Sequence, residues 1–220
     1  VDMETDAVIL AIGHSARDTV EMLYKNGAQI IQKPFSVGAR IEHPQKLIDK
    51  AQYGAFAGHP KLGAADYKLS CHGLHQRGAY TFCMCPGGTV VAAASEKGGV
   101  IVNGMSTLAR DGENANSALL VGIDPVDFPS EHPLAGMYYQ REIEQNAFAL
   151  GGGDYRAPAQ LVGDFLADRE SRALGNVQPT CPTGVTLTNL RYCLPDKVRT
   201  TMQAAITEMD KRLHGFALPD

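Results

Sequence analysis

The stretch "RGAYTFCMCPGGTVVAAA", residues 77–94, decides the fold class, because it joins two β-rich runs through a proline-glycine-glycine turn. Similar short runs, "DYKLSCHG" at 66–73 and "VIVNGMS" at 100–106, lie on either side of it. Short runs bounded by glycine are typical of antiparallel strands. We therefore expect an antiparallel meander, or part of a barrel, between Tyr67 and Gly104, and a further strand at 117–124.

Helical patterns flank this β-rich part, so the expected fold class is α+β. An apolar run at 6–13 predicts a buried strand, and capping and apolar spacing predict a helix after Ser15. The chain reads as extended over 28–43. The remaining helices are expected at 44–54, 133–153, 157–171 and 194–216, the last with an apolar stripe. A soft division falls near 125–133, where the helical part begins.

Composition excludes some classes of partner and location. The 220 residues carry a net charge of −4 and no Lys/Arg run, which argues against nucleic acid. No apolar run is long enough for a membrane span. The five cysteines are odd in number and form no scaffold pattern, and the acidic start resembles no signal peptide, so we expect the cytoplasm. Because the chain opens at Val1 rather than Met, we also expect it to be cut from a longer protein.

Cys83 and Cys85 form a C-x-C pair before the turn, and three interpretations stay open. Structural zinc needs about four ligands, and no second ligand pair has a suitable spacing. A redox pair would form a strained bridge, and only Arg77 offers a nearby positive charge. The plainest interpretation is two small side chains packed in a strand.

Three other places hold candidate ligand groups. The strand-to-helix corner at Gly13 could bring backbone N–H groups to a phosphate, although no G-x-G-x-x-G fingerprint occurs in the chain. The polar stretch 102–121 offers donors at Asn103, Arg110, Asn114 and Asn116, and Arg110 could hold a carboxylate in a forked geometry. A long loop with Asx-turns explains each asparagine more simply. Arg40 and Glu42 fall on one face of a strand, where a structural ion pair is the default expectation.

The ordered motifs "AIGHSARDT", "KPFSVGARIEHPQ", "FCMCPGG", "RDGENANSALLV" and "LGGGDYRAPAQLVGDFL" resemble the uncharacterised FAD-dependent dehydrogenase family, also labelled NAD(FAD)-utilising dehydrogenases. The resemblance runs through nearly the whole chain. It implies an FAD-dependent oxidoreductase with NAD(P)H as a candidate reductant. It also implies that the glycine-rich flavin fingerprint lies outside this chain, so the segment alone would be inactive and would not bind FAD tightly.

The resemblance further implies a division of the chain and roles for single residues. Residues 1–32 would be a remnant of the nucleotide-binding, Rossmann-like domain, 33–125 a β-rich insert domain and 126–220 a mostly helical subdomain. Residues implied to contact the cofactor are Gly13, His14, Ser15, Arg17, Pro86, Gly87 and Gly88. Residues implied to line the substrate pocket are Cys83, Cys85, Asn103 and Arg110, with Arg40 and Glu42 at its edge.

No catalytic residue and no metal ligand set is assigned from the sequence, which leaves the substrate and the oligomeric state open. The alternative function is a non-catalytic ligand- or metal-binding α+β module that uses Cys83 and Cys85. A thiol redox protein is the third interpretation, and it rests on the same two residues.

Overall fold

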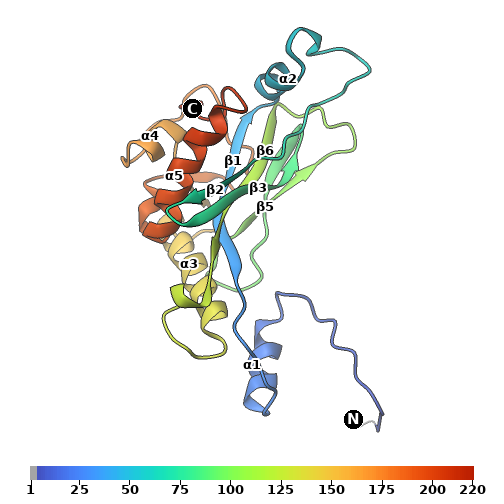
Figure 1. Cartoon of the computed structure of the whole chain (residues 1–220), viewed down its shortest axis with the longest axis vertical. Coiled ribbons are helices and arrows are strands. Elements are labelled where there is room, and N and C mark those ends of the chain that lie inside the picture. Colours follow the sequence, from blue (N-terminus) through green and yellow to red (C-terminus); the bar gives the residue numbers. More distant parts are fainter. Residues whose placement is uncertain (1–3) are drawn as a thin grey trace.

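A computed structural model describes residues 4–220, so the first three residues of the expected 1–32 unit lie outside the described range. The fold is α+β and is built on a four-stranded antiparallel sheet with the order β1-β6-β3-β2 (Figure 1). Its strands are β1 (Phe35–Pro44), β2 (Ser70–Leu74), β3 (Arg77–Cys85) and β6 (Asn114–Ile123). The long strands β1 and β6 pair over their full lengths and form the longest ladder of the sheet.

Two small sheets complete the β structure of the described residues. β4 (Gly88–Ala92) and β5 (Val102–Ser106) form an antiparallel hairpin, while β7 (Ala157–Ala159) and β8 (Val185–Leu187) pair in parallel. The expected meander is therefore wrong in its order, because β6 and not β4 lies beside β3. The pairing of β3 with β6 shifts register between Phe82 and Cys85, and a bulge of this kind bends the strand away from the sheet. No closed barrel forms within residues 4–220.

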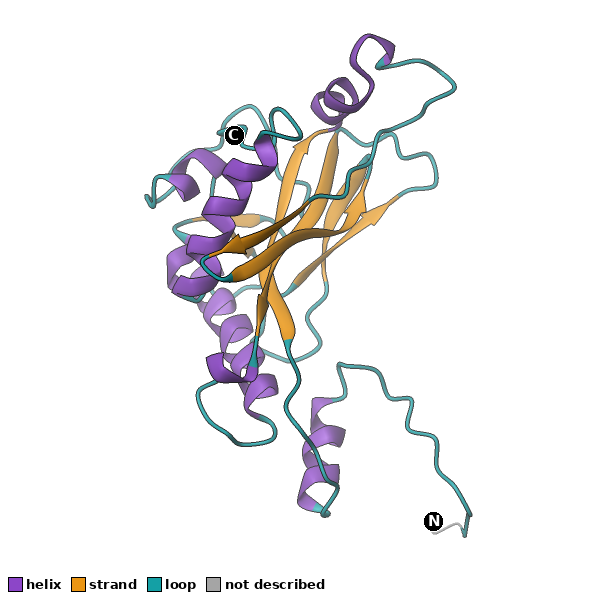
Figure 2. Ribbon diagram, viewed as in Figure 1, coloured by secondary structure: helices purple, strands orange, loops and turns teal. Residues whose placement is uncertain are grey.

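Five α-helices are present in the described part, of which the three nearest the C-terminus lie along one side of the large sheet and the other two lie beyond its ends (Figure 2). Their bounds are α1 (Arg17–Lys25), α2 (Gln45–Tyr53), α3 (Ala135–Gly151), α4 (Val162–Leu166) and α5 (Asp196–Asp210). Short 3-10 turns lie at Gly54–Phe56, Pro125–Asp127 and Leu190–Tyr192. No helix of residues 4–220 is long and apolar enough to cross a membrane.

The core forms where α5 packs on the large sheet. The predicted stripe of α5 is confirmed as core, and its buried members are Val198, Met202, Ala205, Ile206 and Met209. They meet sheet residues such as Leu119 and Val121, which alternation places on one face of β6. Fully burying each large apolar side chain contributes about 1.5–3 kcal/mol. This contact therefore fixes one face of the sheet, and the β4–β5 hairpin lies against part of the opposite face.

The expected helix at 157–171 is wrong at both of its ends. Pro158 lies in strand β7, whose partner is β8, and the chain becomes helical only from Val162 to Leu166. The carbonyl of Ala159 accepts a bond from the backbone of Thr188, so tertiary pairing holds this segment extended. Asp168, in a left-handed conformation with φ 51°, follows the short helix.

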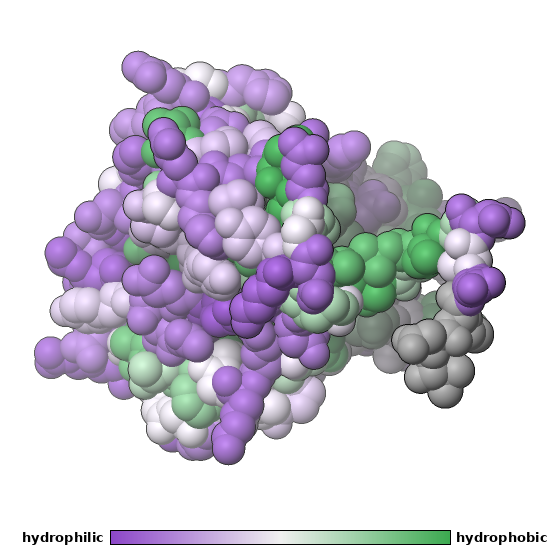
Figure 3. All heavy atoms as spheres, turned by 90° about the horizontal axis from the view of Figure 1, so that it is seen from below, coloured by the Kyte–Doolittle hydropathy of each residue, from purple (hydrophilic) through white to green (hydrophobic). Residues whose placement is uncertain are grey.

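The predicted strand at 6–13 does not form in the described part of the chain. Its apolar side chains stand in solvent, with Val8 80% and Ile9 93% exposed. Figure 3 shows this green run beside the grey terminus, standing clear of the main body. Residues 28–32 also form no strand. A strand needs hydrogen-bonding neighbours, and no described segment supplies them here. The expected divisions at 32 and 125 stay predictions.

Candidate functional site: an arginine on the outer face of the sheet

Arg40 lies in the middle of β1, on the face of the sheet turned away from α5. Side chains alternate along a strand, so its neighbours Ala39 and Ile41 contribute to the core side while Arg40 points to the other. The register aligns Arg40 with Ala118 on β6 and Ala118 with Phe82 on β3. The guanidinium therefore stands in a row that crosses three strands.

The Arg40 guanidinium connects the large sheet to the β4–β5 hairpin. Its Nε donates to Asn116 Oδ1 at 2.7 Å, its Nη1 to Asn103 Oδ1 at 3.2 Å, and its Nη2 to the Cys83 carbonyl at 2.7 Å. Nη2 also lies 3.6 Å from Cys85 Sγ. The bonded groups are thus amide or carbonyl oxygens and one sulfur, without a formal negative charge from a carboxylate.

The local backbone geometry of β3 and β5 permits these contacts of the Arg40 guanidinium. Cys83 adopts φ 45° within the bulge of β3, a conformation uncommon for a residue with a side chain. The bulge presents its carbonyl to Arg40. Gly104 of β5 covers the guanidinium closely, since a Cβ there would collide with Arg40 Nη2 and Asn116 Oδ1. The C-x-C motif is therefore a bulge that supplies a carbonyl and a sulfur to an arginine.

The charge of Arg40 lacks a carboxylate partner within the described residues. The other arginines that are buried or half-buried all form ion pairs, namely Arg17, Arg77, Arg141 and Arg199. Burial lowers the pKa of Arg40, because desolvation disfavours the charged form. Asn116 is fully buried beside it, and its Nδ2 has no hydrogen-bond partner. The site thus holds unused donor capacity.

An apolar cavity of about 230 Å³ adjoins Arg40. It runs along β1 and is lined by the outer-face residues Ala118 and Leu120 and by the segment 100–102 and helix α3. Residues of the core side, among them Val37, Cys193 and Leu194, complete the lining. Arg40 is one of its few charged lining residues, with Glu144, whose carboxylate is already bonded to Arg17. The cavity therefore offers apolar surface next to an arginine without a carboxylate partner.

Three residues predicted from the sequence to line a pocket, Cys83, Cys85 and Asn103, do come together, and all three contact Arg40. The expected ion pair for Arg40 and Glu42 is wrong, because Glu42 instead accepts from the hydroxyl of Thr180. Asn116 is expected from the sequence to be an asparagine of a loop turn, but it lies instead in β6 at the site. Only the register of β6 against β1 and β3 brings it to the site, and the sequence carries no signal for that register.

The other predicted pocket residue, Arg110, lies exposed in the following loop and adopts φ 52°. Its carbonyl occupies the space beside Gly87, where a Cβ would collide with it. Pro86, Gly87 and Gly88 are all buried, and the Gly87 N–H donates to Gln45 Oε1 at 2.7 Å. The glycines of the turn therefore make room for the protein's own backbone. Their role toward a cofactor stays a prediction that this packing does not favour.

The corner at Gly13 is open to solvent. Gly13, His14 and Ser15 are exposed, and Ser15 Oγ lies 2.9 Å from His14 Nδ1. Gly13 has φ 72° and open space where a Cβ would stand, so a ligand could approach its backbone. This corner fits the edge of a larger ligand but forms no cradle around one.

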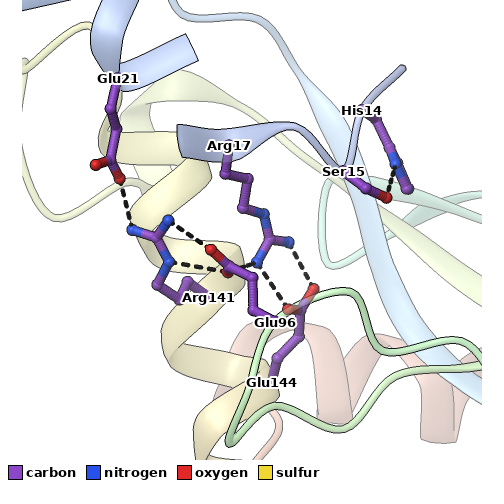
Figure 4. A network of polar contacts seen from close by, with 7 residues as sticks. All are labelled: His14, Ser15, Arg17, Glu21, Glu96, Arg141 and Glu144. Atoms are coloured by element: carbon purple, nitrogen blue, oxygen red, sulfur yellow. Dashed lines mark hydrogen bonds and ion pairs between the residues drawn. The ribbon is translucent and has the colours of Figure 1, made fainter. Parts of the chain in front are cut away.

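Arg17, predicted to orient that corner, is 5% exposed and points away from it into a network of ion pairs (Figure 4). It donates to Glu144 at 2.7 and 2.8 Å and to Glu96 at 2.5 Å. Arg141 of α3 joins Glu96 to Glu21 of α1. The hydrogen bonds that Arg17 donates to these carboxylates raise the pKa of Arg17, and those that Arg141 and Arg17 donate to Glu96 lower the pKa of Glu96 to about 2. The network fastens α1 to α3.

The interpretations based on metal or disulfide chemistry gain no support. Within residues 4–220, no three His, Cys, Asp or Glu side chains gather in a way that could hold a metal ion. The five cysteines are free thiols in the structure: Cys71, Cys181 and Cys193 are buried, Cys85 is half-buried and Cys83 is exposed. Arg77, the cation that the sequence offered to the pair, binds Asp127 instead.

Fold and site together define an α+β domain that presents a guanidinium without a carboxylate partner beside an apolar cavity. Comparison with known proteins gives its family. Residues 34–220 match the model of the FAD-dependent protein, C-terminal domain-like family, and the chain belongs to this family. An uncharacterized protein of Clostridium beijerinckii is 53% identical over 216 residues. That alignment covers 98% of this chain but only 40% of the relative.

The described residues do not build a flavin cradle of their own. A pyrophosphate group is normally received by a glycine-rich loop at a helix N-terminus, and the open glycine that precedes α1, Gly13, lacks the further glycines of that loop. The turn at 86–88 is filled by protein backbone. The residues present are therefore suited to contact the edge of a flavin, and they are not suited to bind the whole cofactor.

Proposed function

We propose that this chain forms the substrate-facing part of an FAD-dependent oxidoreductase. The observation that carries the proposal is the Arg40 site: a half-buried guanidinium without a carboxylate partner, beside an apolar cavity, in a chain of an FAD-dependent family. A bound flavin supplies the hydride or electron chemistry of such enzymes. The residues of this chain bind and orient the substrate and keep water away from it.

The proposal assigns most of the flavin binding to protein outside this chain. The relative is much longer, with 40% of its length covered. The apolar residues of 6–13 are exposed, as expected of a strand whose sheet lies elsewhere. Residues 1–32 would then belong to the nucleotide-binding domain, and 33–125 and 126–220 would form the β-rich and helical parts of the substrate side. Gly13, His14 and Ser15 would lie at the edge of the cofactor.

Two binding measurements test this assignment. The longer protein, purified without added cofactor, should show a flavin absorption spectrum and release FAD on denaturation. The 220-residue chain alone should bind FAD weakly, because it lacks the pyrophosphate loop. Sub-micromolar binding of FAD by the chain alone, or a longer protein that takes up no flavin, would contradict the proposal.

The reductant and the cellular location are proposals of the same kind. We propose NADH or NADPH as the electron donor and the cytoplasm as the location, the latter because the cysteines are free thiols. Mixing the flavin-loaded longer protein anaerobically with each nicotinamide should bleach the flavin absorbance. Bleaching by neither nucleotide would remove NAD(P)H from the proposal and leave the flavin assignment intact.

A further inference from the structure

We infer that Arg40 is the recognition residue for the carboxylate of a small, mostly apolar organic acid, whose body lies in the adjoining cavity. This inference deepens the proposed function by naming the class of substrate for the same site. It rests on the bonds, burial and charge of the residues around the guanidinium.

The first argument is that Arg40 has no counter-charge among the described residues. Taking an ion out of water costs several kcal/mol unless a counter-charge lies beside it. The four other buried or half-buried arginines of the described part meet this requirement with Asp or Glu. Arg40 instead contacts Asn116, Asn103, Cys83 and Cys85. A bound anion would supply what these neighbours lack.

The second argument is the donor capacity that remains. Nη1 has two N–H groups, and one donates to Asn103. Nη1 therefore keeps one free N–H. Nη2 donates one N–H to the Cys83 carbonyl at 2.7 Å and the other to the Cys85 sulfur at 3.6 Å, and sulfur is a weak acceptor. A carboxylate that replaces the sulfur contact can take one N–H from each terminal nitrogen, which is the fork geometry that a carboxylate binds. The unpartnered Nδ2 of the buried Asn116 is a further free donor in the same cluster.

The third argument separates a carboxylate from a phosphate. The groups bonded to the Arg40 guanidinium include no second cation. A carboxylate carries one negative charge and is balanced by one guanidinium. A phosphate monoester carries about −1.5 to −2 at neutral pH, so about a third to a half of its charge would stay uncompensated. The site is matched to a single-charged acid.

The fourth argument is the surroundings. Ala118 stands beside Arg40 in register, and it lines the cavity together with the apolar side chains of Leu120, Ile143 and Ala147. The cavity volume of about 230 Å³ lies below the roughly 300–1,000 Å³ of pockets that hold drug-sized ligands. The acid is therefore small, and its body is apolar.

The inference is tested by the binding of trans-cinnamate to the 220-residue chain. Binding is measured by calorimetry and by the rise in Tm. Cinnamate should bind, while cinnamyl alcohol, which has the same body without the charge, and inorganic phosphate should not. Arg40→Gln should weaken cinnamate by at least about tenfold, since a charge-assisted bond contributes about 1.5–3 kcal/mol. Arg40→Lys keeps the charge but loses the fork, so its loss should be smaller.

Three further variants separate the cavity and the charge from their surroundings. Arg212→Gln makes the same change of net charge at an exposed arginine far along the chain and should leave binding unchanged. Ala147→Phe should fill the cavity and weaken cinnamate although Arg40 is intact. Loss of binding in Arg110→Gln with full binding in Arg40→Gln would overturn the inference and move the site to the loop.

A readout on the unaltered protein keeps the test independent of variant folding. Cys83 is exposed and its carbonyl is bonded to Arg40, whereas Cys71, Cys181 and Cys193 are buried. Cinnamate should slow the alkylation of Cys83 by iodoacetamide, measured by mass spectrometry, and cinnamyl alcohol should not. Equal rates with and without saturating cinnamate, or tighter binding of phosphate than of cinnamate, would refute the carboxylate assignment. Since no flavin is present, these results stand apart from the flavin test of the longer protein.

Discussion

At the junction of α1 with α3, three carboxylates surround two guanidiniums, whereas at the Arg40 site a guanidinium meets amides, a carbonyl and sulfur. The junction residues Arg17 and Glu144 are 5% and 7% exposed, and their charges are matched within the protein. The Arg40 site is half-buried and lacks that match. The first arrangement is complete and holds two segments together. The second is complete only with an added anion, which is why we regard it as a binding site.

The largest expected effect is the loss of Glu144 from the junction. Glu144→Ala leaves Arg17 buried with only the partly exposed Glu96, and breaking a buried pair costs about 3–5 kcal/mol. Hydrogen exchange of the α1 amides should rise steeply as the helix detaches. Glu21→Ala is the matched control, because its contact with Arg141 is more exposed and should cost at most about 1 kcal/mol. Equal protection of α1 in both variants would show that the network does not hold the helix.

Acid should open the same junction and leave the Arg40 site alone. The pKa of Glu96 is lowered to about 2 in the folded protein from an ordinary value of 4.5. The unfolded or detached state thus binds the proton more readily, so the stabilisation is complete above about pH 4.5 and is lost as the pH falls toward 2. Protection of α1 measured from pH 6 downward should fall in that window. Glu96→Gln should abolish this dependence.

The packing of Gly104 on Arg40 gives the next effect. Gly104→Ala places a Cβ against Arg40 Nη2 and Asn116 Oδ1, and such overpacking costs about 1–3 kcal/mol. The expected loss in Tm is about 2–12 °C, with a parallel loss of cinnamate binding. Gly122→Ala on β6 is the control, because its Cβ would meet open space. A Gly104→Ala protein as stable as the control would mean that β5 does not press on the guanidinium.

The local part of this fold could be predicted from the sequence because periodicity reports it. The stripe of α5 and the strands around the turn at 86–88 follow from spacing. Pairing does not, since β3 lies beside β6 across more than thirty residues of chain. Residues 6–13 show a further limit: their apolar pattern predicts a strand, but a strand also needs neighbours, and no described segment provides them.

The same limit applies to the site. The sequence singled out Cys83, Cys85 and Asn103, and the structure brings them together at Arg40. The sequence could not show whether Arg40 has a carboxylate partner, because that depends on which side chains the register of β6 places beside Arg40. Asn116, fully buried and with an unused donor, looks like an ordinary loop asparagine in the sequence. The chemistry of the site lies in long-range contacts.

The smallest expected effect separates a binding site from a structural bridge. Arg40→Met removes an uncompensated cation, which favours folding, but it leaves Asn116 Oδ1 and the Cys83 carbonyl without a donor, which opposes it. These effects offset each other, so the free energy of unfolding in urea should change by no more than about 1 kcal/mol.

The same substitution at Arg77 is the matched comparison. Arg77 lies on β3 and forms a two-bond pair with Asp127, whose side chain is 5% exposed. Arg77→Met leaves that carboxylate buried with only the exposed Lys197 beside it, so its cost should be about 3 kcal/mol. If Arg40→Met proved as destabilising as Arg77→Met, the Arg40 guanidinium would be holding the hairpin to the sheet. A small loss of stability together with a complete loss of cinnamate binding would instead show that Arg40 serves ligand binding, because the fold would remain stable without its guanidinium.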